Sequence, residues 1–174
     1  MRLLISVLLC GALATAALTT PPAVGPHLAD RRPAPAATRL SWPLTPPEVV
    51  RQFVPPTHPY GPGHRGVDLA GAPGQPVHAA AGGRVVFAGW LANRHVIAIE
   101  HPDGLRTSYE PVRPVVRTGS PVSRGQLIGH LEAGHPECAA PPGQTCLHWG
   151  VRRGRQYLDP LRLVGSGQVR LLPW

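Results

Sequence analysis

Three side chains of the types that bind zinc stand out in this sequence. His64 and Asp68 are four positions apart, and His148 follows far downstream. Two imidazole nitrogens and one carboxylate oxygen suit a catalytic zinc, which keeps its fourth position open. The residue types and spacing therefore predict a zinc site with the ligands His64, Asp68 and His148. The alternative is that His64 and Asp68 only hydrogen-bond to each other and that His148 packs separately.

The elements expected to position these side chains are short β-strands. Runs rich in β-branched and aromatic residues are separated by Gly, Pro and Asp-Gly turns. These runs cover residues 83–89, 94–100, 105–109, 126–129 and 146–151. No long helical period is present, so we expect an all-β fold, a compact antiparallel β-sheet sandwich or barrel-like domain. A helical turn within residues 46–53 and a short closing turn at residues 159–163 are the expected exceptions.

The first residues have the pattern of a secretory signal peptide. A short basic start and an apolar run lead to a small-residue cleavage site near Ala16 and Ala17. We expect a signal peptide over residues 1–17, a Pro- and Ala-rich linker over 18–40, the folded domain over 41–163 and a tail over 164–174. A transmembrane anchor is the competing interpretation, but a span needs about 20 apolar residues. A lipoprotein signal at Cys10 is disfavoured, because the small residue usual before such a cysteine is absent.

Two cysteines, Cys138 and Cys146, remain once the predicted signal is removed. We expect a secreted, extracytoplasmic and wall-associated protein with no stable membrane span. In that oxidising setting we expect a disulfide between Cys138 and Cys146. The closed loop is short, so chain entropy assigns the bond about 2.5 kcal/mol of stabilisation. The alternative is a free thiol at Cys146. Because residues i and i+2 of a strand face the same side, Cys146 should point toward the same region as His148.

The net charge of +8 comes with arginine as the sole strongly basic residue type, since the chain has no lysine. A basic exported protein is attracted to polyanions such as cell-wall polymers or acidic membrane surfaces. The arginines are scattered, aromatic residues make up 5% of the chain and no recognition motif is present. We therefore expect no nucleic-acid binding.

Taken in order, the motifs resemble those of the lysostaphin-like, LytM-type zinc metalloendopeptidases, which cleave peptide bonds in bacterial peptidoglycan. The resemblance covers about residues 42–163. It rests on residues 63–68, 74–77 with 79–85, 101–105, 119 with 125–129, and 147–151. It implies a zinc ion held by His64, Asp68 and His148. It also implies peptidoglycan or a cell-wall peptide as the partner, with another wall hydrolase as a further candidate.

The chain departs from the family pattern at two positions that carry non-ligand histidines in the family. Cys146 stands at the first position of the His-x-His motif, and Pro111 stands at the third position of the Tyr-x-His motif. Proline and a disulfide-bonded cysteine cannot do acid or base work. Losing one such group typically lowers the rate by about 10²- to 10⁴-fold.

Three candidate substitutes lie nearby in the sequence. His130 and His135 lie just before the predicted disulfide loop, where solvated histidines are the usual case. Glu110 alternates with Tyr109, so we expect its side chain to face away from the site and into solvent. The residues thus leave enzymatic activity undecided. The candidates are a secreted zinc endopeptidase, a degenerate domain that binds wall peptide or regulates another hydrolase, and a disulfide-stapled interaction module.

Overall fold

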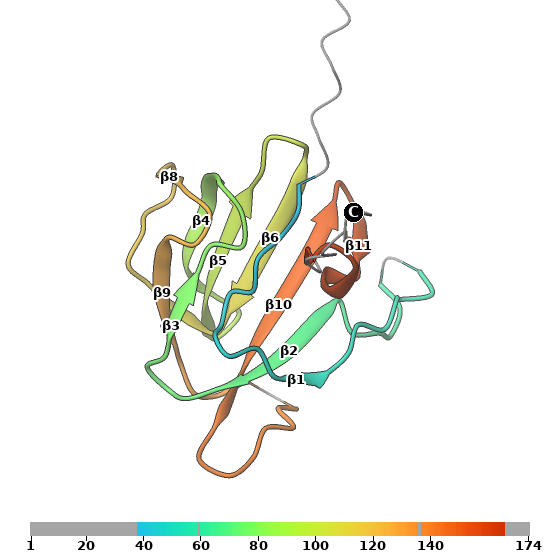
Figure 1. Ribbon diagram of the computed structural model, residues 1–174. Coiled ribbons are helices and arrows are strands. Elements are labelled where there is room, and N and C mark those ends of the chain that lie inside the picture. Colours follow the sequence, from blue (N-terminus) through green and yellow to red (C-terminus); the bar gives the residue numbers. More distant parts are fainter. Residues whose placement is uncertain (1–37, 59, 136, 166–174) are drawn as a thin grey trace, which may run out of the picture. The chain divides into compact units, whose positions relative to one another are not determined.

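The chain is almost entirely antiparallel β-structure in the computed structural model, which describes residues 38–58, 60–135 and 137–165 (Figure 1). The predicted signal peptide, most of the predicted linker and residues 166–174 of the predicted tail lie outside this part. The 3₁₀ turn η1, at Pro160–Arg162, is the one helical element among the described residues. The all-β prediction is thus confirmed. No helix within the described ranges is long and apolar enough to cross a membrane.

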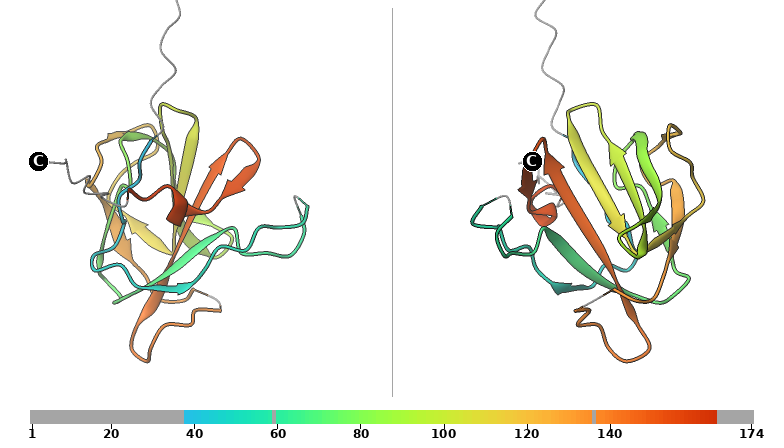
Figure 2. Two further views of the ribbon diagram at one scale, coloured as in Figure 1. Left: turned by 45° about the vertical axis from the view of Figure 1, so that its right-hand side comes forward. Right: turned by 180° about the vertical axis from the view of Figure 1, so that it is seen from behind.

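Eight strands form the larger sheet, in the order β1-β2-β10-β6-β5-β4-β8, with β11 paired to β10. The nine-residue strand β10 lies between β2 and β6, as the two views of Figure 2 also show. The bounds are β1 Val49–Arg51, β2 Gly66–Gly71, β4 Gly83–Leu91, β5 Arg94–Glu100, β6 Leu105–Glu110, β8 Pro121–Val122, β10 Thr145–Arg153 and β11 Gln156–Leu158.

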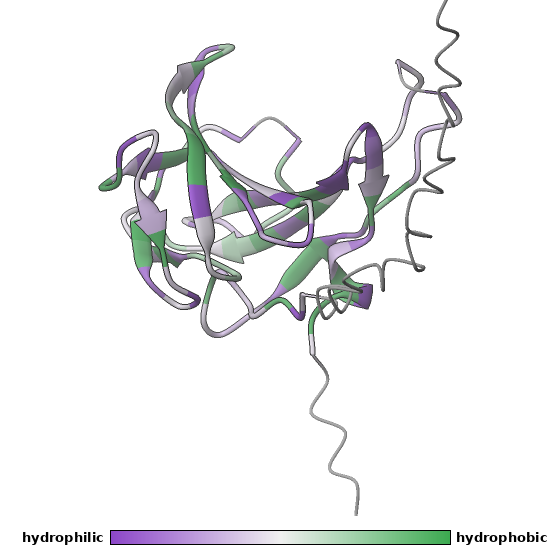
Figure 3. Cartoon of the chain, turned by 90° about the horizontal axis from the view of Figure 1, so that it is seen from above, coloured by the Kyte–Doolittle hydropathy of each residue, from purple (hydrophilic) through white to green (hydrophobic). Residues whose placement is uncertain are grey.

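A smaller sheet has three strands in the order β3-β9-β7. Its strands are β3 Pro76–His78, β7 Val112–Pro114 and β9 Leu127–Leu131. Ile128 and Leu131 of β9 are fully buried in the same hydrophobic cluster as Trp149 of β10 and Tyr109 of β6. The two sheets therefore share one core, and Figure 3 shows hydrophobic and hydrophilic residues alternating along several strands.

The register between β6 and β10 decides which side chains face the core and which face outward. Tyr109 pairs with Trp149, and both side chains are buried. The next pair is Glu110 with His148, and both of these side chains are partly exposed. Successive side chains on a strand point to opposite faces. Glu110 and His148 therefore share the face opposite the core.

A chain of hydrogen bonds crosses the core beside Tyr109. The Tyr109 hydroxyl donates to Thr107 Oγ1 at 2.9 Å and accepts from the Ala80 amide at 3.0 Å. His101 Nε2 lies 2.9 Å from Thr107 Oγ1, and His101 Nδ1 lies 2.8 Å from the carbonyl oxygen of Gly82. Every bond is satisfied when His101 Nδ1 carries the proton and the Thr107 hydroxyl donates to Nε2. Burial raises the pKa of Tyr109 to about 12.

The structure corrects one expected element and adds five strands that were not predicted, β2, β3, β7, β8 and β11. The predicted helical turn within residues 46–53 is wrong, because Val49–Arg51 forms the edge strand β1 and pairs with β2. A helical segment this short is marginal on its own, so the hydrogen bonds offered by the sheet edge prevail. Strand β2, at Gly66–Gly71, was not predicted. All six of its residues are buried, so its sequence lacks the alternation that marks a half-exposed strand.

Candidate metal centre and its cleft

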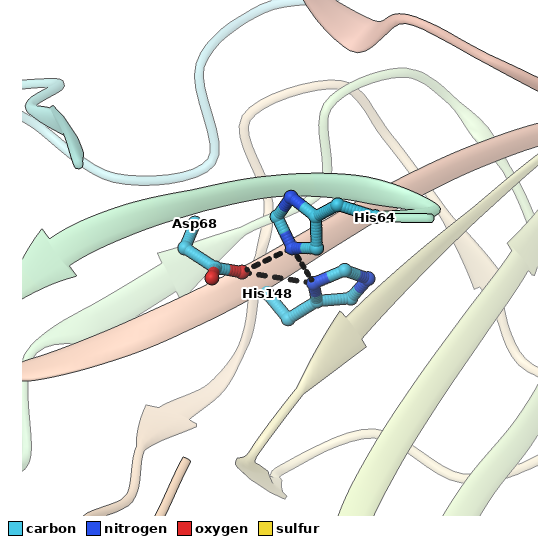
Figure 4. A group of neighbouring side chains, drawn as sticks. All are labelled: His64, Asp68 and His148. Atoms are coloured by element: carbon cyan, nitrogen blue, oxygen red, sulfur yellow. Dashed lines mark hydrogen bonds and ion pairs between the residues drawn. The ribbon is translucent and has the colours of Figure 1, made fainter. Parts of the chain in front are cut away.

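Two neighbouring strands bring the three predicted ligands together (Figure 4). Asp68 lies on β2 and His148 on β10, directly opposite one another in the antiparallel register. His64 lies just before β2, where its backbone forms an isolated bridge with Val54. Sheet pairing therefore joins residues that are 80 positions apart in the sequence.

The facing atoms of the three side chains form a small triangle. His64 Nε2 lies 3.0 Å from Asp68 Oδ1 and 3.1 Å from His148 Nδ1, and His148 Nδ1 lies 2.9 Å from Asp68 Oδ1. Ligand atoms at 2.0–2.2 Å from a tetrahedral zinc are about 3.3–3.6 Å apart. The triangle is tighter than that by a few tenths of an ångström, so small side-chain shifts let these residues fit a zinc ion. We refer to His64, Asp68 and His148 as the triad.

The ring orientation of His64 is set by the backbone. Its Nδ1 lies 2.7 Å from the carbonyl oxygen of Gln52. A carbonyl oxygen only accepts hydrogen bonds, so Nδ1 carries the proton and Nε2 presents a lone pair to Asp68 and His148. Metal-binding histidines commonly donate their second N–H to a carbonyl or carboxylate in this way.

Asp68 supplies a buried carboxylate whose charge is incompletely compensated. Burial disfavours its charged form, but the hydrogen bond with His148 and the electrostatic interactions with His135, His148 and His64 outweigh it and lower its pKa. Its Oδ2 has no hydrogen-bond partner among the described residues, and Arg51 Nη1 is 4.0 Å away. A buried carboxylate oxygen without a partner is costly, and a bound cation would offset that cost.

A cleft of about 370 Å³ opens beside the triad, with His64 and His148 in its wall. Glu110 also lines this cleft, so the prediction that it faces away from the site is wrong. The Glu110 side chain does point away from the core, on the opposite face to buried Tyr109. The site lies on this outer face as well, because Glu110 pairs with His148. Glu110 forms an ion pair with Arg94, at 2.9 Å between Oε2 and Nε.

His135 and His130, the two histidines named as candidate substitutes, have different positions. His135 lines the cleft, and its Nε2 lies 3.5 Å from Asp68 Oδ1. Its side chain is 9% exposed, and its ring centroid is 5.8 Å from that of His148. His130 lies on β9 in the smaller sheet and does not line the cleft.

Pro111 and Cys146, the two departures from the motifs that the sequence resembles, have structural roles here. Cys146 is fully buried and forms the predicted disulfide with Cys138, with 5.5 Å between the Cα atoms. Pro111 lies between β6 and β7, and its carbonyl oxygen accepts a hydrogen bond from the Glu132 amide at 3.0 Å. Neither residue offers a titratable group to the cleft.

The family model described as "Peptidase family M23" matches residues 62–160, an interval that holds the whole triad and more than half of the chain. The chain belongs to peptidase family M23. An uncharacterized protein of Mycobacterium tuberculosis is 56% identical to this M23 chain over 141 residues, which are 78% of the chain and 55% of that protein. The M23 chain thus spans about half the length of this relative.

Two further comparisons show similarity to proteins whose names state a function. The murein hydrolase activator NlpD of Escherichia coli is 31% identical over 105 residues, covering 59% of this chain and 26% of NlpD. The catalytic domain of the antimicrobial peptidase lysostaphin from Staphylococcus simulans is 26% identical with a TM-score of 0.55. That structural match covers 67% of this chain and 90% of the lysostaphin domain.

Proposed function

We propose that this M23 chain is a zinc-dependent hydrolase of peptidoglycan peptides, with His64, Asp68 and His148 as its metal ligands. The observation that carries the proposal is the convergence of three ligand atoms, all within 3.1 Å of one another, in the wall of an open cleft. Zinc with three protein ligands is the form that supports catalysis, because one position stays available. The similarity to the lysostaphin catalytic domain supports the same reaction class.

The chain's own residues prepare the centre in three ways. The Gln52 carbonyl fixes the His64 tautomer, burial keeps water from competing for the Asp68 carboxylate, and the strand register places His148 opposite Asp68. When bound, zinc supplies Lewis-acid polarisation of the scissile carbonyl and activation of water. The residues hold the ion, and the cleft presents the peptide bond to it.

The cleft and the charge of the chain favour a polar, extended substrate. Ion pairs border the cleft, Arg94 with Glu110 and Arg51 with Glu137, and Ser108 adds a hydroxyl to its lining. Such paired side chains can exchange partners with the carboxylates and amides of a peptide. The net charge of +8 would hold an exported protein near anionic wall polymers. We therefore propose an extracytoplasmic, wall-associated location and wall peptide as the substrate.

A second candidate function is a domain that binds wall peptide, or regulates another wall hydrolase, without cutting. Pro111 and Cys146, which stand where the resemblance places non-ligand histidines, favour it. The similarity to a protein named murein hydrolase activator favours it as well. In this case the cleft would serve recognition, and the triad would stabilise the fold through its metal.

Digestion of purified peptidoglycan separates the two candidates. The zinc-loaded chain is incubated with peptidoglycan, and the soluble products are analysed by mass spectrometry for new peptide termini. The hydrolase proposal predicts cleavage that His64→Ala abolishes and His130→Ala, outside the cleft, preserves. Co-sedimentation with peptidoglycan and stimulation of an added wall hydrolase, without new termini from the chain alone, would instead support the second candidate.

A further inference from the structure

The two positions that lack the family's non-ligand histidines are both anchors of one loop. This anchored loop, residues 132–144 with residue 136 outside the described part, connects β9 to β10. Cys146 holds it through the disulfide with Cys138, and the Pro111 carbonyl holds its first residue by accepting from the Glu132 amide. The two departures from the family pattern are therefore connected in space, although they are far apart in sequence.

Side-chain contacts fix the anchored loop further. At its start, Glu132 Oε2 lies 2.8 Å from His95 Nδ1, and the Glu132 carbonyl accepts from the Thr145 hydroxyl at 3.2 Å. Nearer the disulfide, Glu137 forms an ion pair with Arg51 at 2.7 Å. Arg51 lies on β1 opposite Asp68, so this contact ties the loop to the strands that carry the triad. Residues 132, 137 and 138 are thus all held in place.

His135 lies between these anchors and reaches the triad. Its Nε2 is 3.5 Å from Asp68 Oδ1, and its ring is tilted by 32° against that of His148. The cluster of ligand atoms within 4.8 Å of one another consists of His64, Asp68 and His148 among the described residues. His135 lies at the edge of that cluster and in the cleft wall, the place of a group that faces substrate.

We propose that His135 is a catalytic residue of this chain and takes over the work of the missing non-ligand histidines. This role rests on the proposed hydrolase function. The His135 ring donates an N–H to the carbonyl oxygen of the scissile peptide bond. Hydrolysis adds water to the carbonyl carbon and breaks the C–N bond, and the leaving amine takes a proton that came from the water. In the tetrahedral transition state the carbonyl oxygen gains negative charge. A hydrogen-bond donor positioned at that oxygen stabilises this charge most effectively.

The two ion pairs in the cleft wall, Arg94 with Glu110 and Arg51 with Glu137, are less suited to this role. Glu110 and Glu137 are acceptors whose negative charge would repel a developing oxyanion. Arg94 and Arg51 are engaged in ion pairs with these two carboxylates, at 2.9 and 2.7 Å. Among these five residues His135 has the donor nearest to Asp68, with Nε2 3.5 Å from Oδ1 against 4.0 Å from Arg51 Nη1 to Oδ2.

Kinetics of three variants test this role. His135→Ala should lower kcat by about 100- to 1000-fold with little change in KM, the usual effect of removing one oxyanion donor. His135→Gln, whose amide still donates, should recover part of the rate, and free imidazole should raise the rate of His135→Ala. His130→Ala is the matched control and should behave like the wild type. If His135 had only a structural role, neither the His135→Gln substitution nor free imidazole would restore the rate.

Zinc content and analogue binding give readouts that need no turnover. Each variant should keep the zinc content of the wild type. A phosphinic peptide, whose tetrahedral anion mimics the charged state, should bind to His135→Ala about 100-fold more weakly than to the wild type in calorimetry, while an uncleaved amide peptide binds to both alike. If the wild type cuts no peptidoglycan but this difference persists, the hydrolase proposal fails and the catalytic role fails with it, while His135 is still shown to donate to a tetrahedral anion bound beside the triad.

Two further results would overturn the proposal. The first is a His135→Ala chain with wild-type cleavage and wild-type affinity for the phosphinic peptide. The second is loss of zinc from that variant, which would show His135 to be a fourth ligand of the metal rather than a residue that faces the substrate.

Discussion

The imidazole of His148 lies against the backbone of Gly66 on the neighbouring strand. A Cβ at position 66 would stand 2.8 Å from His148 Nε2 and would collide with the backbone carbonyl of Trp149. Backbone in the middle of a sheet cannot move away cheaply. The close approach that positions one triad histidine therefore depends on the absence of a side chain at residue 66.

Gly66→Ala should displace His148 and weaken metal binding. Overpacking in a close-packed interior typically costs about 1–3 kcal/mol. If this cost falls on the position of His148, zinc affinity should drop by about 5- to 150-fold. Zinc affinity is measured by chelator competition and stability by urea unfolding. Gly89→Ala on β4, where the nearest atom to the added Cβ is 3.7 Å away, should change neither. Equal zinc affinities for the two variants would show that position 66 does not control His148.

Tyr109→Phe should destabilise the fold by about 1–3 kcal/mol, the usual cost of leaving buried polar groups unpaired. The change removes the acceptor of the Ala80 amide and the donor to Thr107 while keeping the ring in place. Urea unfolding measures the effect. Tyr60→Phe, at a side chain that is 94% exposed, serves as the control and should leave the free energy of unfolding unchanged. A Tyr109→Phe chain as stable as the control would mean that water or relaxation replaces these bonds.

Buried His101 should make the stability of the fold fall in mild acid. Burial lowers the pKa of His101 and outweighs the opposite effect of its hydrogen bond to the Gly82 carbonyl. As the pH falls through the ordinary value of about 6.5, the unfolded chain takes up a proton that the native imidazole refuses. Stability is therefore full above this pH and declines below it, by at most about 1.4 kcal/mol per pH unit from this group.

Comparison with His101→Gln isolates this contribution from the other histidines. The stability advantage of the wild type over His101→Gln should be largest near pH 7.5 and smaller near pH 5.5, as measured by urea unfolding at both values. An advantage that stays constant or grows on acidification would contradict the assignment of His101 as a neutral core residue.

Removing the disulfide should loosen the anchored loop and cost stability. The chain-entropy estimate for the nine residues from Cys138 to Cys146 is about 2.6 kcal/mol. Cys138→Ser combined with Cys146→Ser should show this loss in urea unfolding. Hydrogen exchange should show the loss of protection in the loop but not in β5. Unchanged exchange in residues 132–144 would mean that Glu132 and the Arg51–Glu137 ion pair hold the loop without the disulfide.

The triad could be predicted from sequence because its residue types and spacing match a zinc ligand set. The strand at residues 146–151 was predicted as well, as a short apolar run that follows a Pro- and Gly-rich turn. Strand β2 could not be found this way, because burial on both faces removes the alternation. The prediction of a helical turn was wrong for a related reason. Val49–Arg51 forms a strand because it pairs with β2, and this partner is distant in sequence.

The cleft was less accessible to sequence reasoning than the triad. Glu110 was placed on the wrong side because its orientation relative to the site follows from its pairing with His148, a long-range register. The position of His135 depends on the disulfide and on the contacts of Glu132 and Glu137, none of which has a local pattern. The one available signal was its closeness to Cys138, which indicated a loop tied to the strand of His148.

Zinc content of the purified chain tests the proposed centre most directly. After reconstitution with zinc and removal of the excess, elemental analysis should find one zinc per wild-type chain. His64→Ala and His148→Ala should lose it, and His130→Ala should retain it. A folded wild-type chain without zinc, or zinc retained in both triad variants, would contradict the assignment of His64, Asp68 and His148 as the metal ligands.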